Sequence, residues 1–186
     1  MSAADAAHTY YESARQELIE RIRLRDNSLF VYLGAVGALF GTALAKTAAG
    51  QILLVVPYLT LGAVFLMAQH HEVIGNLESY LVNELAPFLD EHEANVPQWN
   101  NSSALHAYYG QAMLWRLVAH CMLLLVPPAA ALILNFDMIW SFPKSAFWVY
   151  GCICFGVSAV VILRAHQRRL TSYNEFPWKH TELQDR

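Results

Sequence analysis

Eight histidines are the residues through which this sequence could most readily bind a metal. Only His70 and His71 are adjacent, and no HxxHH or HxxxH element accompanies them. Metal-dependent membrane hydroxylases and desaturases need several closely spaced histidine pairs. A heme needs two facing histidines in apolar segments, and only His120 lies in one. We therefore expect no metal, no cofactor and no catalytic residues, and we interpret the histidines as polar side chains at helix ends.

Carboxylates are concentrated in residues 69–116, where Arg116 is the only basic residue. A general acid–base pair among them would lack a neighbouring nucleophile or glycine loop, so a solvated helix face explains them better. If copies of the chain assemble around an axis, these carboxylates would form an acidic vestibule that concentrates cations. They are Glu72, Glu78, Glu84, Asp90, Glu91 and Glu93.

Arginines alternate at positions 21, 23 and 25, just before the first apolar stretch. One interpretation is that they anchor the chain to lipid headgroups and determine its orientation. The other is that an oligomer arranges them as a ring that binds phosphate.

These groups must be positioned by four long apolar stretches, at residues 29–45, 52–68, 117–134 and 146–163. Each stretch has about the length that spans a bilayer core as a helix. The chain is 56% hydrophobic and only 15% charged, whereas soluble domains contain about 25% charged residues. The sequence predicts an all-α membrane protein with four transmembrane helices, helical cytosolic extensions and an inserted cytosolic helical segment between the second and third spans.

The apolar stretches divide the chain into five segments. Residues 1–28 form an amphipathic helix, 29–68 a transmembrane hairpin, 69–116 a polar insert, 117–163 a second hairpin and 164–186 a tail. All lysines and arginines except Lys46 and Lys144 lie in the three polar segments. The positive-inside rule therefore predicts that both termini and the insert are cytoplasmic.

Helical periodicity continues beyond the apolar stretches. The second span is predicted to run into the insert and to end before Pro87, and a mild kink at Pro57 would be tolerable. The third span is predicted to begin as a helix at Ala104 and to be kinked by Pro127 and Pro128.

The first apolar stretch is rich in small residues, which let helix backbones approach closely in lipid. They serve either packing within one bundle or a subunit interface or pore wall, and in each case we expect this helix to be central. No span carries a charged side chain at its centre, which disfavours a pump or a coupled transporter and leaves a channel open. The pore-lining candidates are Tyr32, Gly34, Ala38 and Thr42.

Three segments carry a resemblance, namely residues 14–26 (ARQELIERIRLRD), 33–41 (LGAVGALFG) and 68–75 (AQHHEVIG). They resemble a family of small bacterial membrane effectors of antiphage defence, of which the channel subunit of Hailong-type systems is closest in organisation. The resemblance implies a tetrameric ion channel in the bacterial inner membrane. It also implies that the insert binds a DNA oligomer made by a partner nucleotidyltransferase.

The acidic insert does not suit that ligand, because phosphate binding normally requires Lys and Arg. A nucleotide or DNA oligomer would need arginines from other segments, or aromatic side chains on which its bases stack. The ligand-binding candidates are Arg21, Arg25, Trp99, Tyr108, Tyr109 and Arg168.

The leading hypothesis is a homo-oligomeric channel, gated at its cytosolic layer, that harms the host cell when it opens. The first alternative is a metal-dependent membrane enzyme that uses His and Glu side chains at the helix exits, which would contain stoichiometric iron or zinc. The second is a non-conducting scaffold, for which deletion of residues 90–103 would abolish partner capture.

Overall fold

The computed structural model describes residues 3–45, 47–92, 103–140 and 142–174. Every regular element in these ranges is helical, which confirms the predicted all-α class for the described part of the chain. The four long helices are α1 (Ala3–Ala45), α2 (Val56–Tyr80), α4 (Ser103–Leu134) and α5 (Lys144–Asn174).

Shorter helices join and extend them. The 3-10 helix η1 (Thr47–Val55) precedes α2, and the 3-10 helix η4 (Phe136–Trp140) lies between α4 and α5. The π-helix η2 (Leu81–Leu85) and α3 (Ala86–His92) continue directly from α2. Four helical segments are long and apolar enough to cross a membrane, and they correspond to the four predicted spans.

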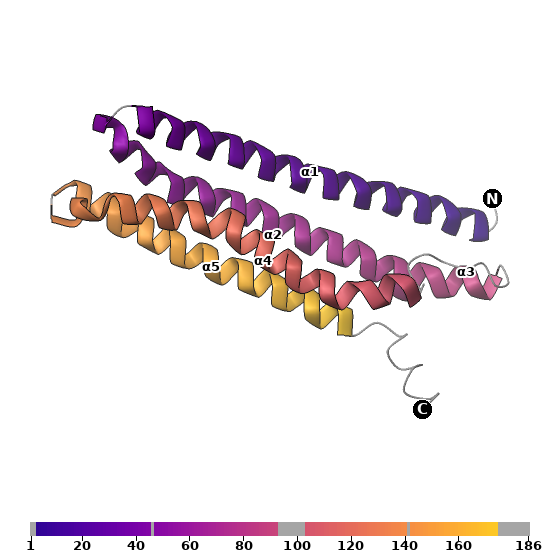
Figure 1. Cartoon of the computed structure of the whole chain (residues 1–186). Coiled ribbons are helices and arrows are strands. Elements are labelled where there is room, and N and C mark those ends of the chain that lie inside the picture. Colours follow the sequence, from indigo (N-terminus) through magenta and orange to yellow (C-terminus); the bar gives the residue numbers. More distant parts are fainter. Residues whose placement is uncertain (1–2, 46, 93–102, 141, 175–186) are drawn as a thin grey trace.

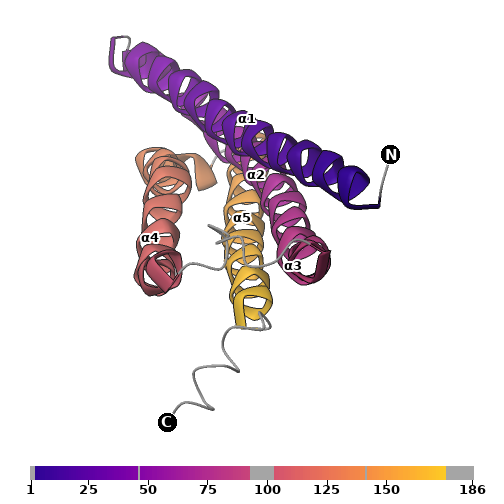
Figure 2. The same ribbon diagram turned by 90° about the vertical axis from the view of Figure 1, so that its right-hand side faces the viewer.

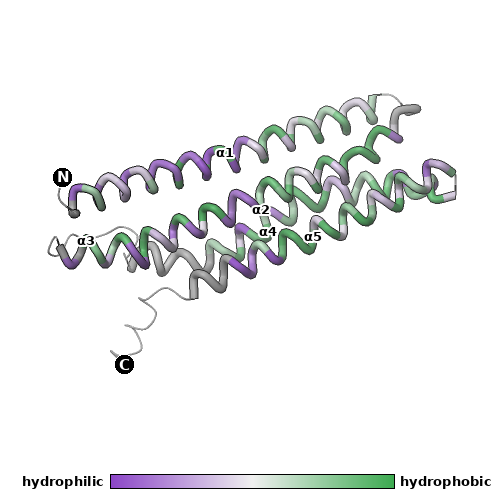
Figure 3. The backbone as a smooth tube through the Cα atoms, turned by 180° about the vertical axis from the view of Figure 1, so that it is seen from behind, coloured by the Kyte–Doolittle hydropathy of each residue, from purple (hydrophilic) through white to green (hydrophobic). Residues whose placement is uncertain are grey.

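The helices are aligned side by side, with α1 along the flank of α2 (Figure 1). In the view turned by 90°, α5 lies between α4 and the continuous helical run of α2, η2 and α3 (Figure 2). The connections η1 and η4 lie at one end, which we call the connection end. The opposite end, which we call the charged end, holds the beginning of α1, the end of α5 and α3, and polar residues are concentrated there (Figure 3).

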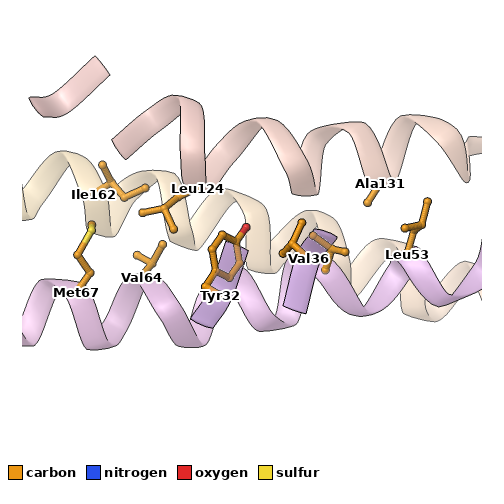
Figure 4. Packing of buried hydrophobic residues seen from close by; sticks show 9 residues of the cluster. Tyr32, Val36, Leu53, Val64, Met67, Leu124, Ala131 and Ile162 are labelled. Atoms are coloured by element: carbon orange, nitrogen blue, oxygen red, sulfur yellow. The ribbon is translucent and has the colours of Figure 1, made fainter. Parts of the chain in front are cut away.

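The main core lies between the four long helices and draws on all of them (Figure 4). Apolar side chains from α1, η1, α2, α4 and α5 meet there, so this core holds the two hairpins together. Its buried members are Tyr32, Val36, Leu53, Val56, Val64, Met67, Leu124, Ala131 and Ile162.

A second, smaller cluster lies at the charged end. There Ala14 and Leu18 of α1 pack against Leu81 and Leu85 of η2 and against Leu89 of α3. Because α1 is one unbroken helix, it joins this cluster mechanically to the main core. At 43 residues it is about 65 Å long.

Pro57 lies in the first turn of α2, where its missing N–H leaves no intrahelical bond unmade. The expectation for Pro87 was wrong. Pro87 does not end the helix that precedes it. It is the second residue of α3, and the π-helix immediately before it changes the hydrogen-bond register, so that the Ala86 N–H donates to the Leu81 carbonyl.

Within a single protomer the first long helix is peripheral. Only 11% of the apolar window of α1 is buried, against 39% for that of α2, which contacts α1, α4 and α5. Larger side chains such as Tyr32 and Val36 face α2, because interlocking bulky groups bury more apolar surface than glycines do. The small residues Gly34, Gly37, Ala38, Gly41 and Thr42 are exposed on the side of α1 that faces away from the rest of the protomer.

Candidate functional site

The four pore-lining candidates lie on two different faces of α1. Gly34, Ala38 and Thr42 follow one another at intervals of four residues and are exposed. Tyr32 is 5% exposed and lies in the main core. The structure therefore brings three candidates together on one face and places the fourth on the opposite face, against α2.

A buried hydrogen bond anchors that opposite face. The Tyr32 and Thr60 hydroxyl oxygens are 2.8 Å apart, and the Thr60 hydroxyl also donates to the Val56 carbonyl at 2.9 Å. Thr60 has a single hydroxyl hydrogen, so Tyr32 must be the donor in the bond between them. This bond joins α1 to α2 at a position where water is excluded.

We expect the substitution Tyr32→Phe to lower the free energy of unfolding by about 1 kcal/mol, because Thr60 loses its donor while the ring still fills its place. Unfolding by denaturing detergent is the appropriate measurement. The matched control is Tyr10→Phe, because Tyr10 is 62% exposed on the same helix. Equal stability of the two variants would contradict the proposed anchor.

The exposed face of α1 is open along its length. A Cβ atom added at Gly34, Gly37 or Gly41 would meet no heavy atom within 4 Å outside the local helix backbone. The Thr42 hydroxyl on this face donates to the Ala38 carbonyl at 2.8 Å, so its hydrogen is satisfied within the helix. This surface, which we call the small-residue face, is smooth, largely apolar and not covered by the protomer.

Two ligand-binding candidates lie near the middle of α1. Arg21 pairs with Glu17 at 3.2 Å, and Arg25 pairs with Asp26 at 2.7 Å. Both partners belong to α1 itself, so these contacts hold the guanidinium groups beside their own helix. The Arg25–Asp26 pair is part-buried and the Arg21–Glu17 pair is more exposed, and a phosphate could displace either carboxylate.

The other ligand-binding candidates are distributed differently. Arg168 of α5 pairs with Glu72 of α2 at 2.7 Å, so it joins two helices at the charged end. Tyr108 and Tyr109 belong to α4, but their side chains, like Trp99 as a whole, lie outside the described residues.

The structure also reveals a histidine cluster that the sequence did not predict. The His71 and His120 rings meet edge to face, with centroids 5.4 Å apart and an angle of 68° between them. With His166 and Arg116 they line a small cavity between α2, α4 and α5. The other lining residues are Met67, Met113, Leu117, Ile162 and Ala165.

This cavity is better suited to water than to a substrate. Its volume of about 20 Å³ admits roughly one water molecule, which imidazole nitrogens could bind. Within the described ranges, no group of three or more His, Cys, Asp and Glu side chains is arranged to hold a metal ion. The sequence contains one indication of this cluster. His71, His120 and His166 each lie within one helical turn of the end of an apolar stretch that faces the charged end.

Comparison with known proteins identifies no relative. No family model matches the chain, and neither a curated protein nor a solved structure matches it.

Proposed function

We propose that the protein is a homo-oligomeric membrane ion channel, not an enzyme, that acts as a toxic effector in bacterial antiphage defence. The observation that carries this proposal is the small-residue face of α1, which is open in the protomer although it lies in a helix able to cross a membrane. Small residues on a lipid-facing surface favour close packing with another helix. A second copy of the chain would supply that helix.

In the proposed assembly, copies of α1 surround an axis and the other helices form the outer layer. Gly34, Ala38 and Thr42 would line the pore, and Tyr32 would hold each wall helix to α2 through its bond to Thr60. The chain carries no charge between Asn27 and Ala45. A pore lined by small and hydroxyl-bearing residues can conduct without charged groups, and dewetting can close it. Four copies are the number that the family resemblance favours.

Gating is proposed to begin at the charged end, in the cytoplasm of the bacterial cell. The cluster of α1 with η2 and α3 is small, so a ligand that alters it would displace α1 at modest energetic cost. Because α1 continues unbroken to the proposed pore, that displacement reaches the small-residue face directly. The ligand is proposed to be a nucleotide or a DNA oligomer bound by Arg21, Arg25 and Arg168.

Measurement of membrane potential in bacteria that express the protein tests this function in the cell. We expect loss of potential, reported by a voltage-sensitive dye, to precede growth arrest when a partner nucleotidyltransferase is active. Growth arrest with an unchanged potential would favour the non-conducting scaffold instead.

A further inference from the structure

A groove of about 990 Å³ runs between α2 and α5 at the charged end. Its lining changes character along its length, with apolar side chains towards the connection end and polar or charged side chains beyond them. The lining residues are Phe65, Ala68, Gln69, His71, Glu72, Gly75, Asn76, Val161, Arg164, Ala165, Gln167 and Arg168.

The two walls of the groove run in the same direction. Pro57 approaches Gly151 near the connection end, and Glu72 pairs with Arg168 at the charged end, so α2 and α5 are parallel. The separation of 96 positions in the Glu72–Arg168 pair places Phe65 level with Val161. It likewise places Arg164 level with Ala68, where the second apolar stretch ends.

The groove therefore crosses the level at which both helices leave their apolar stretches. Phe65 is 51% exposed and forms the apolar part together with Val161. Arg164 and Arg168 are both exposed at the polar part. In a bilayer, this level is where acyl chains give way to headgroup phosphates.

We propose that the groove binds an anionic phospholipid. The phosphate would lie between the Arg164 and Arg168 guanidinium groups, and an acyl chain would lie along Phe65 and Val161. Two guanidinium groups and the Glu72 carboxylate give the polar part a net charge of about +1, which complements one phosphodiester. Basic pockets between transmembrane helices are typical headgroup sites, and the groove volume lies within the range of about 300–1,000 Å³ that is usual for ligand sites.

The ion pair with Glu72 is compatible with this role. Its distance of 2.7 Å holds the Arg168 guanidinium at the groove wall, and the separate N–H groups of a guanidinium can bind a carboxylate and a phosphate together. Because Arg164 lies one helical turn earlier, both side chains can reach the same phosphate. The site requires only that α2 and α5 span a membrane, and it does not depend on conduction.

Native mass spectrometry of the protein in nanodiscs made of equal parts phosphatidylglycerol and phosphatidylcholine tests the proposal. We expect phosphatidylglycerol to be retained preferentially, saturating at one molecule per protomer. The double variant Arg164→Gln/Arg168→Gln should weaken that retention by about tenfold or more, because charge-assisted hydrogen bonds to the phosphate are lost. The matched control, Arg23→Gln, removes the same type of charge from an exposed position outside the groove and should retain the lipid.

Two further arms separate the outcomes. Glycerophosphoglycerol, which has the same headgroup without acyl chains, should compete far more weakly than a short-chain phosphatidylglycerol. Equal competition would overturn the proposal in favour of a soluble phosphate ligand. If the double variant fails to fold, the single variant Arg164→Gln tests the proposal by itself, because it leaves the Glu72–Arg168 pair intact. Unchanged lipid retention in a folded Arg164→Gln variant, or in a folded double variant, would also overturn the proposal.

Discussion

Gly37→Leu is expected to dissociate the oligomer and to abolish conduction while leaving the protomer folded. Gly37 and Gly41 form a ridge of the small-residue face beside the ridge of Gly34, Ala38 and Thr42 that would line the pore, and a Cβ added at Gly37 meets no heavy atom within 4 Å. A leucine side chain there finds space in the protomer but would occupy the position of a neighbouring helix. Overpacking of such a contact costs about 1–3 kcal/mol, so association should weaken by about tenfold or more.

Light scattering of the purified variant in detergent measures its assembly, and ion flux from proteoliposomes measures its activity. Gly156→Leu is the matched control, because Gly156 is also exposed, lies in an apolar stretch and has no heavy atom within 4 Å of an added Cβ. That variant should assemble and conduct as the natural protein does. A Gly37→Leu variant that remains an intact, conducting oligomer would show that α1 does not form the subunit contact.

Gly151→Leu is expected to destabilise the protomer itself. Gly151 is buried where α5 meets two other helices, and an added Cβ would lie 3.0 Å from Leu132 Cδ2 and 3.5 Å from Pro57 Cγ. A leucine side chain extends well beyond Cβ, so it would force α5 away from α2 and α4. We expect a loss of about 1–3 kcal/mol in the free energy of unfolding, or more if the helices cannot separate without breaking other contacts.

Two nearby hydrogen bonds should amplify this effect. The Trp148 indole N–H donates to the Leu132 carbonyl at 3.0 Å, and the Tyr58 hydroxyl donates to the Phe147 carbonyl at 3.2 Å. Both join α5 to its neighbours within one helical turn of Gly151, so displacement of α5 would strain them. Unfolding in denaturing detergent, followed by circular dichroism, is the measurement.

The control for Gly151→Leu is again Gly156→Leu. Leucine has a higher helix propensity than glycine by roughly 0.8 kcal/mol in soluble helices, so the control should be neutral or slightly stabilised. If both variants lose the same stability, the loss cannot be assigned to the contact of Gly151 with Leu132 and Pro57.

The sequence was sufficient to predict the helical class and the four long helices, because uninterrupted apolar residues over a bilayer's thickness leave a helix as the main way to satisfy the backbone. It was less informative about the prolines. Pro87 would break a regular α-helix, but the π-helix at residues 81–85 accommodates it. No residue pattern at these positions predicts a π-helix.

The sequence also did not predict which face of α1 packs against the other helices of the protomer. Gly34 and Tyr32 lie only two positions apart, and both belong to an apolar stretch, so hydropathy does not tell which side faces α2. The histidine cluster was missed for a different reason. His71, His120 and His166 are far apart in sequence, and only the packing of α2, α4 and α5 brings them to one cavity.

Single-channel recording in planar bilayers tests the central claim most directly. Purified protein should produce discrete conductance steps when a short DNA oligomer is added on the side of the charged end. Gly156→Leu should reproduce these steps, and Gly37→Leu should not. Absence of conductance with every nucleotide and oligonucleotide tried, in a preparation shown to contain intact oligomers, would contradict the channel.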